Sequence, residues 1–338
     1  MTAINKSYRI CVLGGDGIGP EVIEQTIYVL KSLPIDFKFQ YGEIGYDTYL
    51  KTGNSLPDET IELVKNSDAT LFGSVTTPPN IKNYRSPIVA LRKTLDLYAN
   101  VRPCRSLPAD ISRKNINMTI VRENTEDLYS GIERVEDNGN RAVSEMIITR
   151  AASEKIIRYA FMLAKKQNYG KITVVHKANV LRETSGLFLR IAQEIAKEYK
   201  EIQMEDMLVD ACAMQLIKNP EKFQVIVTTN MFGDILSDEA SMLVGGLGVA
   251  YSGNIGEKNA VFEPVHGSAP KYAGQNKVNP TAAIMAAKMM LDYIGETENA
   301  GKIEQAILRT MEQKIFTYDL GGNATTKEFS EAVVRNIR

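Results

Sequence analysis

Short apolar runs alternate with amphipathic stretches along nearly the whole chain. The apolar runs predict buried strands, at Ile10–Leu13, Ala69–Phe72, Met118–Val121, Lys171–His176 and Gln224–Thr228. Apolar residues spaced three and four apart predict helices, at Pro20–Leu33, Asp58–Lys65, Ala152–Gln167, Thr184–Tyr199, Thr281–Ile294 and Lys302–Lys314. Strands that alternate with crossover helices are typical of an α/β fold with a mostly parallel sheet.

The pattern changes between Gly131 and Thr149, where two charged, extended runs flank Asn138-Gly139. This dipeptide favours a tight hairpin turn. Because both runs carry many charges, the hairpin cannot form a core by itself. It is either a surface β-ribbon or an arm, about residues 131–149, that pairs with another subunit.

Composition narrows the class of protein. A chain of 338 residues with 44% apolar residues can form two domains, or one large α/β unit with a deep cleft. The net charge of -1 gives no reason to expect a nucleic-acid or membrane partner. Three scattered cysteines argue against disulfides and thiolate zinc sites, and favour a reducing cytoplasm. No apolar stretch is long enough to span a membrane.

The glycine-rich stretch "GGDGIGPEV" follows the first predicted strand and invites comparison with phosphate-binding loops. Gly15, Gly17 and Gly19 are spaced Gly-x-Gly-x-Gly, so the dinucleotide fingerprint fails. Pro20 and Glu21 stand where the other phosphate loop needs Lys and Ser or Thr. The stretch is therefore either a tight strand-to-helix turn or a loop that lines a ligand site.

Carboxylates and basic residues recur in apolar surroundings. Asp234 and Asp238 share one face of a predicted helix, and Asp210 follows an apolar run. They are either solvated or ligands of a hard cation, Mg²⁺ or Mn²⁺. The basic residues also allow two interpretations. Single arginines are often surface residues, but several arginines that converge on one cleft would bind a substrate with two or three carboxylates. Lys177 is either solvated or a base with a lowered pKa. The arginines concerned are Arg92, Arg102 and Arg122.

Long motifs throughout the chain resemble those of the β-decarboxylating dehydrogenases, the family of isocitrate, 3-isopropylmalate and homoisocitrate dehydrogenases. They include "LRKTLDLYANVRP", "VRENTEDLYSGIE", "VHKANV", "NMFGDILSDEAS", "FEPVHGSAPKYAG" and "DLGGNATT". The resemblance implies a non-Rossmann α/β fold with two interleaved domains, residues 1–97 plus 245–338 and residues 98–244. It also implies a homodimer or homotetramer in which the hairpin is the dimer arm.

The resemblance further implies roles for particular residues. Ser86, Arg92, Arg102, Arg122 and Asn179 would bind the substrate carboxylates. Asp234 and Asp238, with Asp210 of a second copy, would hold Mg²⁺ or Mn²⁺. Lys177, also from the second copy, would drive deprotonation of the substrate hydroxyl, and Tyr129 would protonate the enolate left by loss of CO₂.

The resemblance also implies that the cofactor contacts the segment from Glu263 to Asn279, together with Thr77 and with Tyr318 and Asp319. Lys271 and Tyr272 resemble the NADP pattern of isocitrate dehydrogenases, although Gly322 stands where those enzymes carry arginine. NADP is therefore expected, with NAD as the alternative. The implied cofactor-binding residues are Thr77, Glu263, His266, Gly267, Ala269, Lys271, Tyr272, Val278, Asn279, Tyr318 and Asp319.

The start of the helix that carries Arg92 is where this family reads its substrate. Ser86 matches the isocitrate type, whereas Ile88 and Val89 form an apolar wall nearer to the isopropylmalate type. The string "SPIVALR" most resembles homoisocitrate dehydrogenases, so homoisocitrate ranks before isocitrate and isopropylmalate. Two other classes are a non-catalytic regulatory subunit, which would lack catalytic residues that this chain retains, and a nucleotide-binding module, which leaves the aspartates unexplained.

Overall fold

The computed structural model describes residues 6–81, 84–108 and 111–337. The chain divides into two compact units. Unit 1 comprises Met1–Leu95, Leu107–Ser112 and Gly245–Arg338, and unit 2 comprises Asp96–Ser106 and Arg113–Val244. Each unit contains strands covered by helices, so the expected α/β fold class is confirmed.

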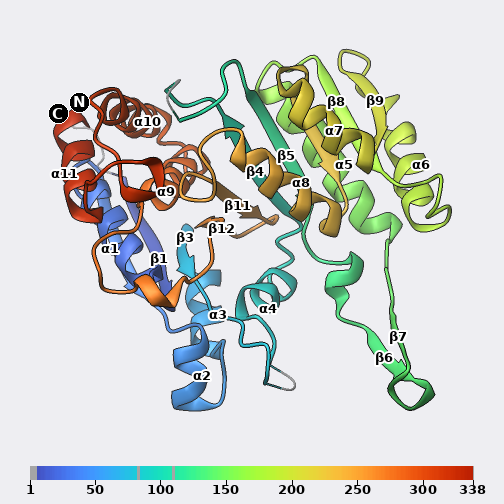
Figure 1. Ribbon diagram of the computed structural model, residues 1–338, viewed down its shortest axis with the longest axis horizontal. Helices are drawn as coiled ribbons and strands as arrows, with labels where there is room; N and C mark the ends of the chain where they lie inside the picture. Colours follow the sequence, from blue (N-terminus) through green and yellow to red (C-terminus); the bar gives the residue numbers. More distant parts are fainter. Residues whose placement is uncertain (1–5, 82–83, 109–110, 338) are drawn as a thin grey trace. The chain divides into compact units, whose positions relative to one another are not determined.

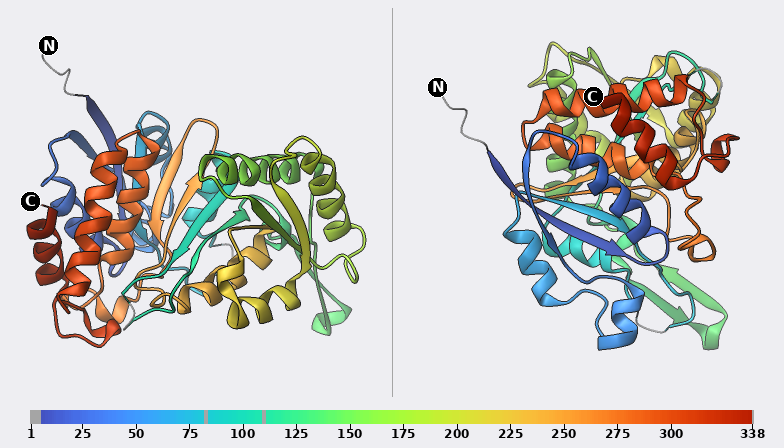
Figure 2. Two further views of the ribbon diagram at one scale, coloured as in Figure 1. Left: turned by 90° about the horizontal axis from the view of Figure 1, so that it is seen from above. Right: turned by 90° about the vertical axis from the view of Figure 1, so that its left-hand side faces the viewer.

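Unit 1 combines the two ends of the chain (Figure 1). Its strands follow the order β2-β1-β3-β12-β11 and are parallel except for the β11–β12 hairpin. The strands are β1 (Ser7–Gly15), β2 (Asp36–Tyr41), β3 (Ala69–Ser74), β11 (Tyr251–Ile255) and β12 (Ala260–Pro264). Helices α9, α10 and α11 pack beside one another, and α1 contacts α9 and α11 (Figure 2). The helices are α1 (Gly19–Leu30), α2 (Tyr46–Thr52), α3 (Asp58–Lys65), α4 (Pro87–Thr94), α9 (Thr281–Tyr293), α10 (Thr297–Glu312) and α11 (Thr326–Ile337).

Unit 2 is built from the middle of the chain. Its strands follow the order β4-β5-β10-β8-β9, antiparallel between β4 and β5 and parallel elsewhere. They are β4 (Ala99–Arg105), β5 (Asn117–Glu123), β8 (Lys171–His176), β9 (Gln203–Leu208) and β10 (Val225–Thr228). The helices are α5 (Arg150–Lys166), α6 (Thr184–Ala196), α7 (Val209–Lys218) and α8 (Asn230–Met242). Helices α7 and α8 close one apolar core with side chains that include Cys212, Leu216, Leu236 and Ala240.

A separate two-stranded ribbon projects from unit 2 (Figure 1). Strands β6 (Glu133–Glu136) and β7 (Arg141–Ser144) are antiparallel and pair Val135 with Ala142. Because Glu136 pairs with Arg141, the connection is the four residues 137–140 and not a two-residue tight turn. Within it, the φ angles of Asn138 and Gly139 are 52° and 96°. Both residues favour positive φ, as the Asn-Gly pattern predicts, so the hairpin itself is confirmed.

Apolar runs predict the strands of mainly apolar sequence well and the strands of mixed sequence poorly, even where every residue is buried, as in β11 and β12. Helix α3 and strand β8 begin and end at the predicted residues. Strands β2, β4, β9, β11 and β12 are not predicted from apolar runs, because charged, glycine or proline residues interrupt them.

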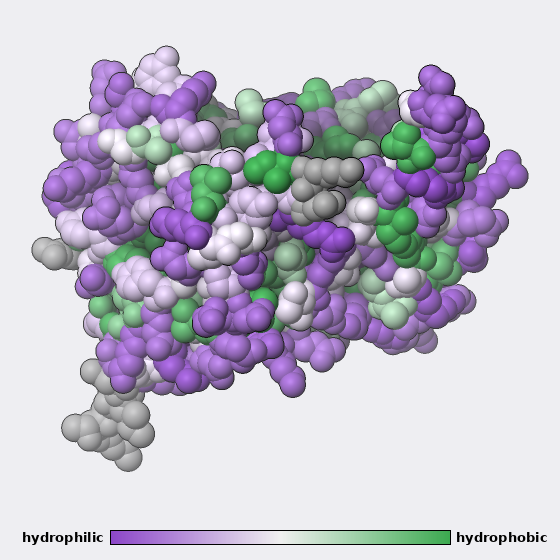
Figure 3. Space-filling model, turned by 90° about the horizontal axis from the view of Figure 1, so that it is seen from below, coloured by the Kyte–Doolittle hydropathy of each residue, from purple (hydrophilic) through white to green (hydrophobic). Residues whose placement is uncertain are grey.

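None of the helices in the described ranges combines the length and apolar character needed to cross a bilayer. The face in Figure 3 is mostly hydrophilic, with scattered hydrophobic residues.

Candidate functional site

Helix α8 places two carboxylates one turn apart in unit 2, beside two buried arginines. Arg102 donates from Nη1 to Asp238 Oδ1 at 3.2 Å and from Nη2 to Asp234 Oδ1 at 3.3 Å. Arg122 forms an ion pair with the same Oδ1 of Asp234. Two guanidiniums therefore balance two carboxylates in one cluster, which we call the arginine–aspartate cluster.

Neutral side chains that the sequence analysis did not single out orient these arginines. Asn100 Oδ1 accepts from Arg102 Nε at 2.7 Å, and Ser237 Oγ accepts from Arg102 Nη1 at 2.6 Å. Asn230 Oδ1 accepts from Arg122 Nε and Nη2 at 2.9 and 2.7 Å. Asn100 and Arg102 are two apart on β4 and share a face, which is the sequence signal that could have revealed Asn100.

A glycine in α8 makes room for Arg122. A Cβ built at Gly233 would lie 2.6 Å from Cγ and 2.7 Å from Cβ of Arg122. These are atoms near the backbone, so Arg122 cannot avoid a larger residue by moving only the end of its side chain. Gly233 is therefore a packing requirement of the arginine–aspartate cluster.

Tyr129 joins the arginine–aspartate cluster from a short 3₁₀ turn, Asp127–Ser130. Its hydroxyl donates to Asp234 Oδ2 at 2.7 Å, and the Arg122 guanidinium carbon lies 4.9 Å from its ring centroid. Burial, together with the Asp234 carboxylate, raises the pKa of Tyr129, while Arg122 opposes this shift. The phenol therefore remains protonated at neutral pH and has a proton to give.

The two aspartates fit part of a hard-cation site. Burial is the main reason that the pKa of Asp238 is raised, and Asp234 adds to the shift while Arg102 opposes it. A divalent cation would reduce the repulsion between the Asp234 and Asp238 carboxylates. Carboxylate oxygens are the ligands that Mg²⁺ and Mn²⁺ prefer. Across the described ranges, however, no three His, Cys, Asp or Glu side chains are grouped so as to hold a metal. A hard cation bound by the two aspartates would therefore need further ligands from water, substrate or a second copy.

Lys177 and Asp210 lie together elsewhere in unit 2. Lys177 follows the end of β8, and its Nζ donates at 2.7 Å to Oδ1 of Asp210 in the first turn of α7. This hydrogen bond is the main reason that the pKa of Asp210 is lowered. Asn179 is exposed in the turn after β8. The pair shares no residue with the arginine–aspartate cluster, so the two form separate groups within one chain.

The third predicted arginine lies in unit 1. Arg92 Nη2 donates to Glu263 Oε1 at 2.7 Å, and the two side chains are only 10% and 7% exposed. Arg92 Nε is buried and has no hydrogen-bond partner among the described residues. Ser86 precedes α4, and its hydroxyl does not cap that helix. Arg92 thus retains a donor that a bound anion could satisfy.

The loop after β12 contacts the glycine-rich stretch. The Ile18 N–H donates to the Ser268 carbonyl at 2.9 Å, and a Cβ at Gly17 would lie 2.1 Å from that oxygen. The Asp16 side chain accepts from the N–H groups of Tyr46, Asp47 and Thr76 at 2.7–3.0 Å. The glycines therefore form a tight turn against the loop predicted to bind the cofactor.

Within that loop, His266 offers an unused acceptor. Its Nδ1 lies 3.1 Å from the Gly267 carbonyl, whereas Nε2 is buried without a partner among the described residues. Burial lowers the pKa of His266, so the ring is neutral and Nε2 can accept. The next turn holds Ala269 at a φ of 35°. An unused acceptor and a left-handed alanine fit a nucleotide-binding loop.

The other predicted cofactor residues lie in the same unit. Lys271 Nζ is 4.8 Å from the Tyr272 ring centroid, and both side chains are exposed. Asn279 donates to Asp319 Oδ2 at 3.0 Å. Thr77 and Tyr318 are exposed, and the carbonyl of Val278 accepts from Thr326. In this loop, His266 Nε2 is thus an acceptor without a partner among the described residues, and the Lys271 ammonium is an exposed cation.

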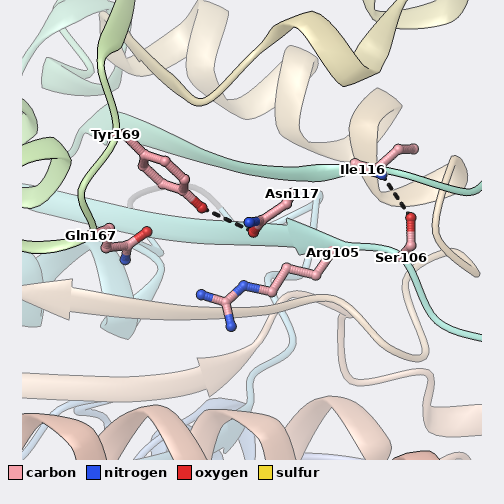
Figure 4. A pocket seen from close by; sticks show the side chains of 6 residues that line it. All are labelled: Arg105, Ser106, Ile116, Asn117, Gln167 and Tyr169. Carbon is pink, nitrogen blue, oxygen red and sulfur yellow. Dashed lines mark hydrogen bonds between the residues drawn. The ribbon is translucent and has the colours of Figure 1, made fainter. Parts of the chain in front are cut away.

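A hollow in unit 2 contains none of the predicted site residues (Figure 4). Its volume is about 530 Å³. In it, Tyr169 donates to Asn117 Oδ1 at 2.9 Å. Asn117 begins β5, whereas Arg122 lies near the end of that strand, so the hollow and the arginine–aspartate cluster lie at opposite ends of β5. The lining residues are Arg105, Ser106, Ile116, Asn117, Gln167 and Tyr169.

Comparison with known proteins gives matches over nearly the full chain. Residues 9–333 match the isocitrate/isopropylmalate dehydrogenase family. A homoisocitrate dehydrogenase of Methanocaldococcus jannaschii is 51% identical over 98% of both chains. A 3-isopropylmalate dehydrogenase of Methanothermobacter thermautotrophicus is 47% identical over 98% of this chain and 99% of its own. The crystal structure of isocitrate dehydrogenase from Methylococcus capsulatus is 44% identical and superposes with a TM-score of 0.94, covering 98% of this chain and 99% of the other.

Proposed function

Since the chain belongs to the isocitrate/isopropylmalate dehydrogenase family, we propose that it converts homoisocitrate to a 2-oxo acid and CO₂ with reduction of NADP. The reaction class is that of the family: an NAD(P)-dependent, decarboxylating oxidoreductase. Isocitrate and isopropylmalate are the alternative substrates. The observation that carries the proposal is the arginine–aspartate cluster, in which guanidiniums and acidic oxygens converge.

The chain's own residues divide the work as follows. Arg102 and Arg122 bind substrate carboxylates, while Lys177 of a second copy drives deprotonation of the substrate hydroxyl. Tyr129, which keeps its proton because its pKa is raised, protonates carbon after CO₂ leaves. Asn179, from the turn that carries Lys177, makes a further polar contact with substrate.

Two bound groups complete the chemistry. Asp234 and Asp238, with Asp210 of a second copy, would hold Mg²⁺ or Mn²⁺. When bound, the ion would supply a Lewis acid for the hydroxyl and for the charge formed on loss of CO₂, and the nicotinamide would supply a hydride acceptor. Removing divalent ions with a chelator should abolish NADP reduction, and added Mg²⁺ should restore it. Full activity in the chelator would overturn the metal assignment.

For the nucleotide, the preference for NADP is supported by Lys271, whose ammonium lies beside the exposed Tyr272 ring. A cation at this place attracts a 2′-phosphate. Gly322, where an arginine is expected in NADP enzymes, has a local explanation: a Cβ there would lie 2.0 Å from the Phe316 carbonyl oxygen. A side chain at position 322 would therefore collide with this backbone, and NAD stays the alternative cofactor.

Charge reversal at Lys271 tests this preference. Lys271→Asp should lower the ratio of kcat/KM for NADP to that for NAD by at least about tenfold, as expected when a charge-assisted hydrogen bond becomes a repulsion. Lys277→Asp is the matched control, because Lys277 is exposed in the same loop. Equal losses in both variants would point to a general field effect, and a wild type that prefers NAD would overturn the proposal.

Substrate choice is proposed to depend on the start of α4. Ser86 offers a hydroxyl for the third carboxylate, and Ile88 and Val89 supply an apolar wall for the longer methylene arm. Ser86→Ala should weaken homoisocitrate turnover more than isopropylmalate turnover, because only the former has a third carboxylate. Equal changes in kcat/KM for both would remove Ser86 from this role.

The enzyme is proposed to act as a homodimer, or a homotetramer built from dimers. Helices α7 and α8, which carry the three aspartates, also expose large apolar side chains, namely Met214, Ile217, Ile235 and Met242. Covering them with the same helices of a second copy would bury apolar surface and deliver Lys177 and Asp210. A sedimentation experiment should find no monomer at micromolar concentration, and Met214→Lys should shift the equilibrium toward monomer.

All three cysteines are free and buried, which supports the proposal that the protein works in a reducing cytoplasm.

A further inference from the structure

Three polar side chains in unit 1, Arg92, Glu263 and Asn254, are joined by hydrogen bonds. Asn254 is not among the residues predicted from the sequence. Asn254 is on β11 and Glu263 on β12, adjacent antiparallel strands. Asn254 is 0% exposed. Its Nδ2 donates to Glu263 Oε1 at 2.7 Å and to the Val261 carbonyl at 3.2 Å. A buried amide that uses both N–H groups in this way is held in one orientation.

The same carboxylate oxygen also receives Arg92. Arg92 Nη2 donates to Glu263 Oε1 at 2.7 Å, so Oε1 accepts from both Asn254 and Arg92. A carboxylate that accepts two short hydrogen bonds on one oxygen cannot rotate without losing at least one of them. Asn254 therefore restrains Glu263, and Glu263 in turn restrains the guanidinium of Arg92.

The restraint matters because Arg92 has one donor left over. Nε of Arg92 is buried and has no hydrogen-bond partner among the described residues, whereas Nη2 is committed to Glu263. A buried donor without an acceptor is costly, and a carboxylate is the acceptor that a guanidinium binds most strongly. The direction of Nε is set by the rest of the guanidinium, because the group is planar and rigid.

We propose that Asn254 is a positioning residue for substrate binding: it fixes Glu263 Oε1, which holds Arg92 so that Nε remains directed for a substrate carboxylate. This inference rests on the proposed function, in which Arg92 binds that carboxylate. Asn254 itself does not touch the substrate. Without its amide, Glu263 can turn and carry Arg92 with it, so substrate binding weakens while the chemical step changes little.

The test is steady-state kinetics of Asn254→Ala at saturating nucleotide and Mg²⁺. We expect KM for the hydroxy acid to rise about tenfold, the factor that corresponds to loss of one charge-assisted hydrogen bond, with kcat within about threefold of wild type. Asn254→Ser, which keeps a donor in less volume, should give a smaller rise. Asn259→Ala is the matched control, because Asn259 lies in the same hairpin and donates to the Val64 carbonyl at 3.2 Å. The control should leave KM unchanged.

A double-mutant cycle separates positioning from general loss of structure. If Asn254 acts through Arg92, adding Asn254→Ala to Arg92→Ala should raise KM no further. Additive effects, or a KM within twofold of wild type in Asn254→Ala, would overturn the inference. A different result, Arg92→Ala with wild-type KM, would instead overturn the proposed role of Arg92. The melting temperature of each variant shows whether it is folded, and if Asn254→Ala is not, Asn254→Ser decides.

Discussion

The two aspartates of α8 are in direct contact with two arginines. Asp234 Oδ1 serves both Arg102 and Arg122, and Oδ2 accepts from Tyr129. Any change in the direction of Arg122 therefore reaches the aspartate and the tyrosine together. This coupling makes small substitutions near Arg122 informative.

Gly233→Ala is expected to disable the site without unfolding the protein. Alanine favours a helix over glycine by about 1 kcal/mol, but its Cβ would lie 2.6 Å from Cγ of Arg122. We expect Arg122 to be displaced and kcat/KM to fall by at least about tenfold. The melting temperature should fall only modestly, because the gain in helix propensity partly offsets an overpacking cost of about 1–3 kcal/mol. Gly186→Ala in α6 is the control, because the nearest atom there, 3.2 Å away, is the flexible end of Arg190. Similar losses in both variants would contradict this account.

Glu126 gives a pH-dependent prediction. Burial is the main cause that raises its pKa to about 7, against hydrogen bonds from Thr149 that lower it. An acid whose pKa is higher in the folded state than in the unfolded state stabilises the fold at low pH. That stability is lost as the pH rises through the folded pKa. Glu126→Gln, which cannot ionise, should therefore gain melting temperature relative to wild type between pH 5 and pH 8.

Glu198→Gln is the control for this prediction. Its hydrogen bond with Arg158 lowers the pKa of Glu198, so the carboxylate is already ionised in both states above pH 5. The difference in melting temperature between Glu198→Gln and wild type should stay constant from pH 5 to pH 8. A constant difference for Glu126→Gln as well would show that Glu126 titrates normally.

At this scale the sequence points to several polar and charged side chains that lie together in the structure, but not to the residues that orient them. Family motifs point to Arg102, Arg122 and Tyr129, and the structure brings these together with Asp234. The hydrogen bonds of Asn230 and Ser237 to the arginines are not predicted, because the sequence of a helix does not show which side chain a polar residue contacts. Such partners depend on where α8 packs against β4 and β5.

At the scale of elements, the β6–β7 ribbon stands out because it has little of its own to stabilise it. Two-stranded hairpins are marginal in water, and this one exposes Val135 to 70%. Its ion pairs, such as Arg134 with Glu145, are exposed and contribute little. A partner surface that covers Val135 would help to explain why the ribbon is stable.

Val135→Lys is expected to weaken subunit association. Burying a valine stabilises an interface by about 1.5 kcal/mol or more, so the dissociation constant measured by sedimentation should rise by about tenfold. Arg141→Lys, an exposed and charge-conserving change in the paired strand, should leave it unchanged. If Val135→Lys associates as tightly as wild type, the ribbon is a surface feature and not an arm.

The same scale shows where apolar patterns succeed. Strand β8, with five consecutive buried residues, is recognised from its apolar residues Ile172, Val174 and Val175. Strand β2 alternates exposed and partly buried residues, and β12 ends in Glu-Pro, so neither forms such a run. Sequence periodicity reports apolar character, so it misses a strand with exposed residues, such as β2, and a buried strand that contains an acid and a proline, such as β12.

For the whole molecule, the decisive feature is that Lys177 and Asp210 form a pair of their own within one chain. We propose that this pair completes the arginine–aspartate cluster of a second copy. The proposal predicts complementation between inactive variants. Lys177→Ala and Tyr129→Phe should each be nearly inactive as homodimers.

Mixed and reassociated, these two variants should recover about a quarter of wild-type activity. Half of the dimers are then mixed, and each mixed dimer has one site with both residues intact. If Lys177 instead served the site of its own chain, every site in a mixed dimer would lack one residue. Absence of recovery, with mixed dimers shown to be present, would contradict the shared site.

The most direct test of the central claim is to measure turnover of homoisocitrate, isocitrate and isopropylmalate with NADP and with NAD, following reduced nucleotide and CO₂ together. The account predicts equal amounts of CO₂ and reduced nucleotide, the highest kcat/KM with homoisocitrate and NADP, and no turnover without a divalent ion. Reduced nucleotide without CO₂, or no reaction with any of the three substrates in the presence of Mg²⁺, would contradict it.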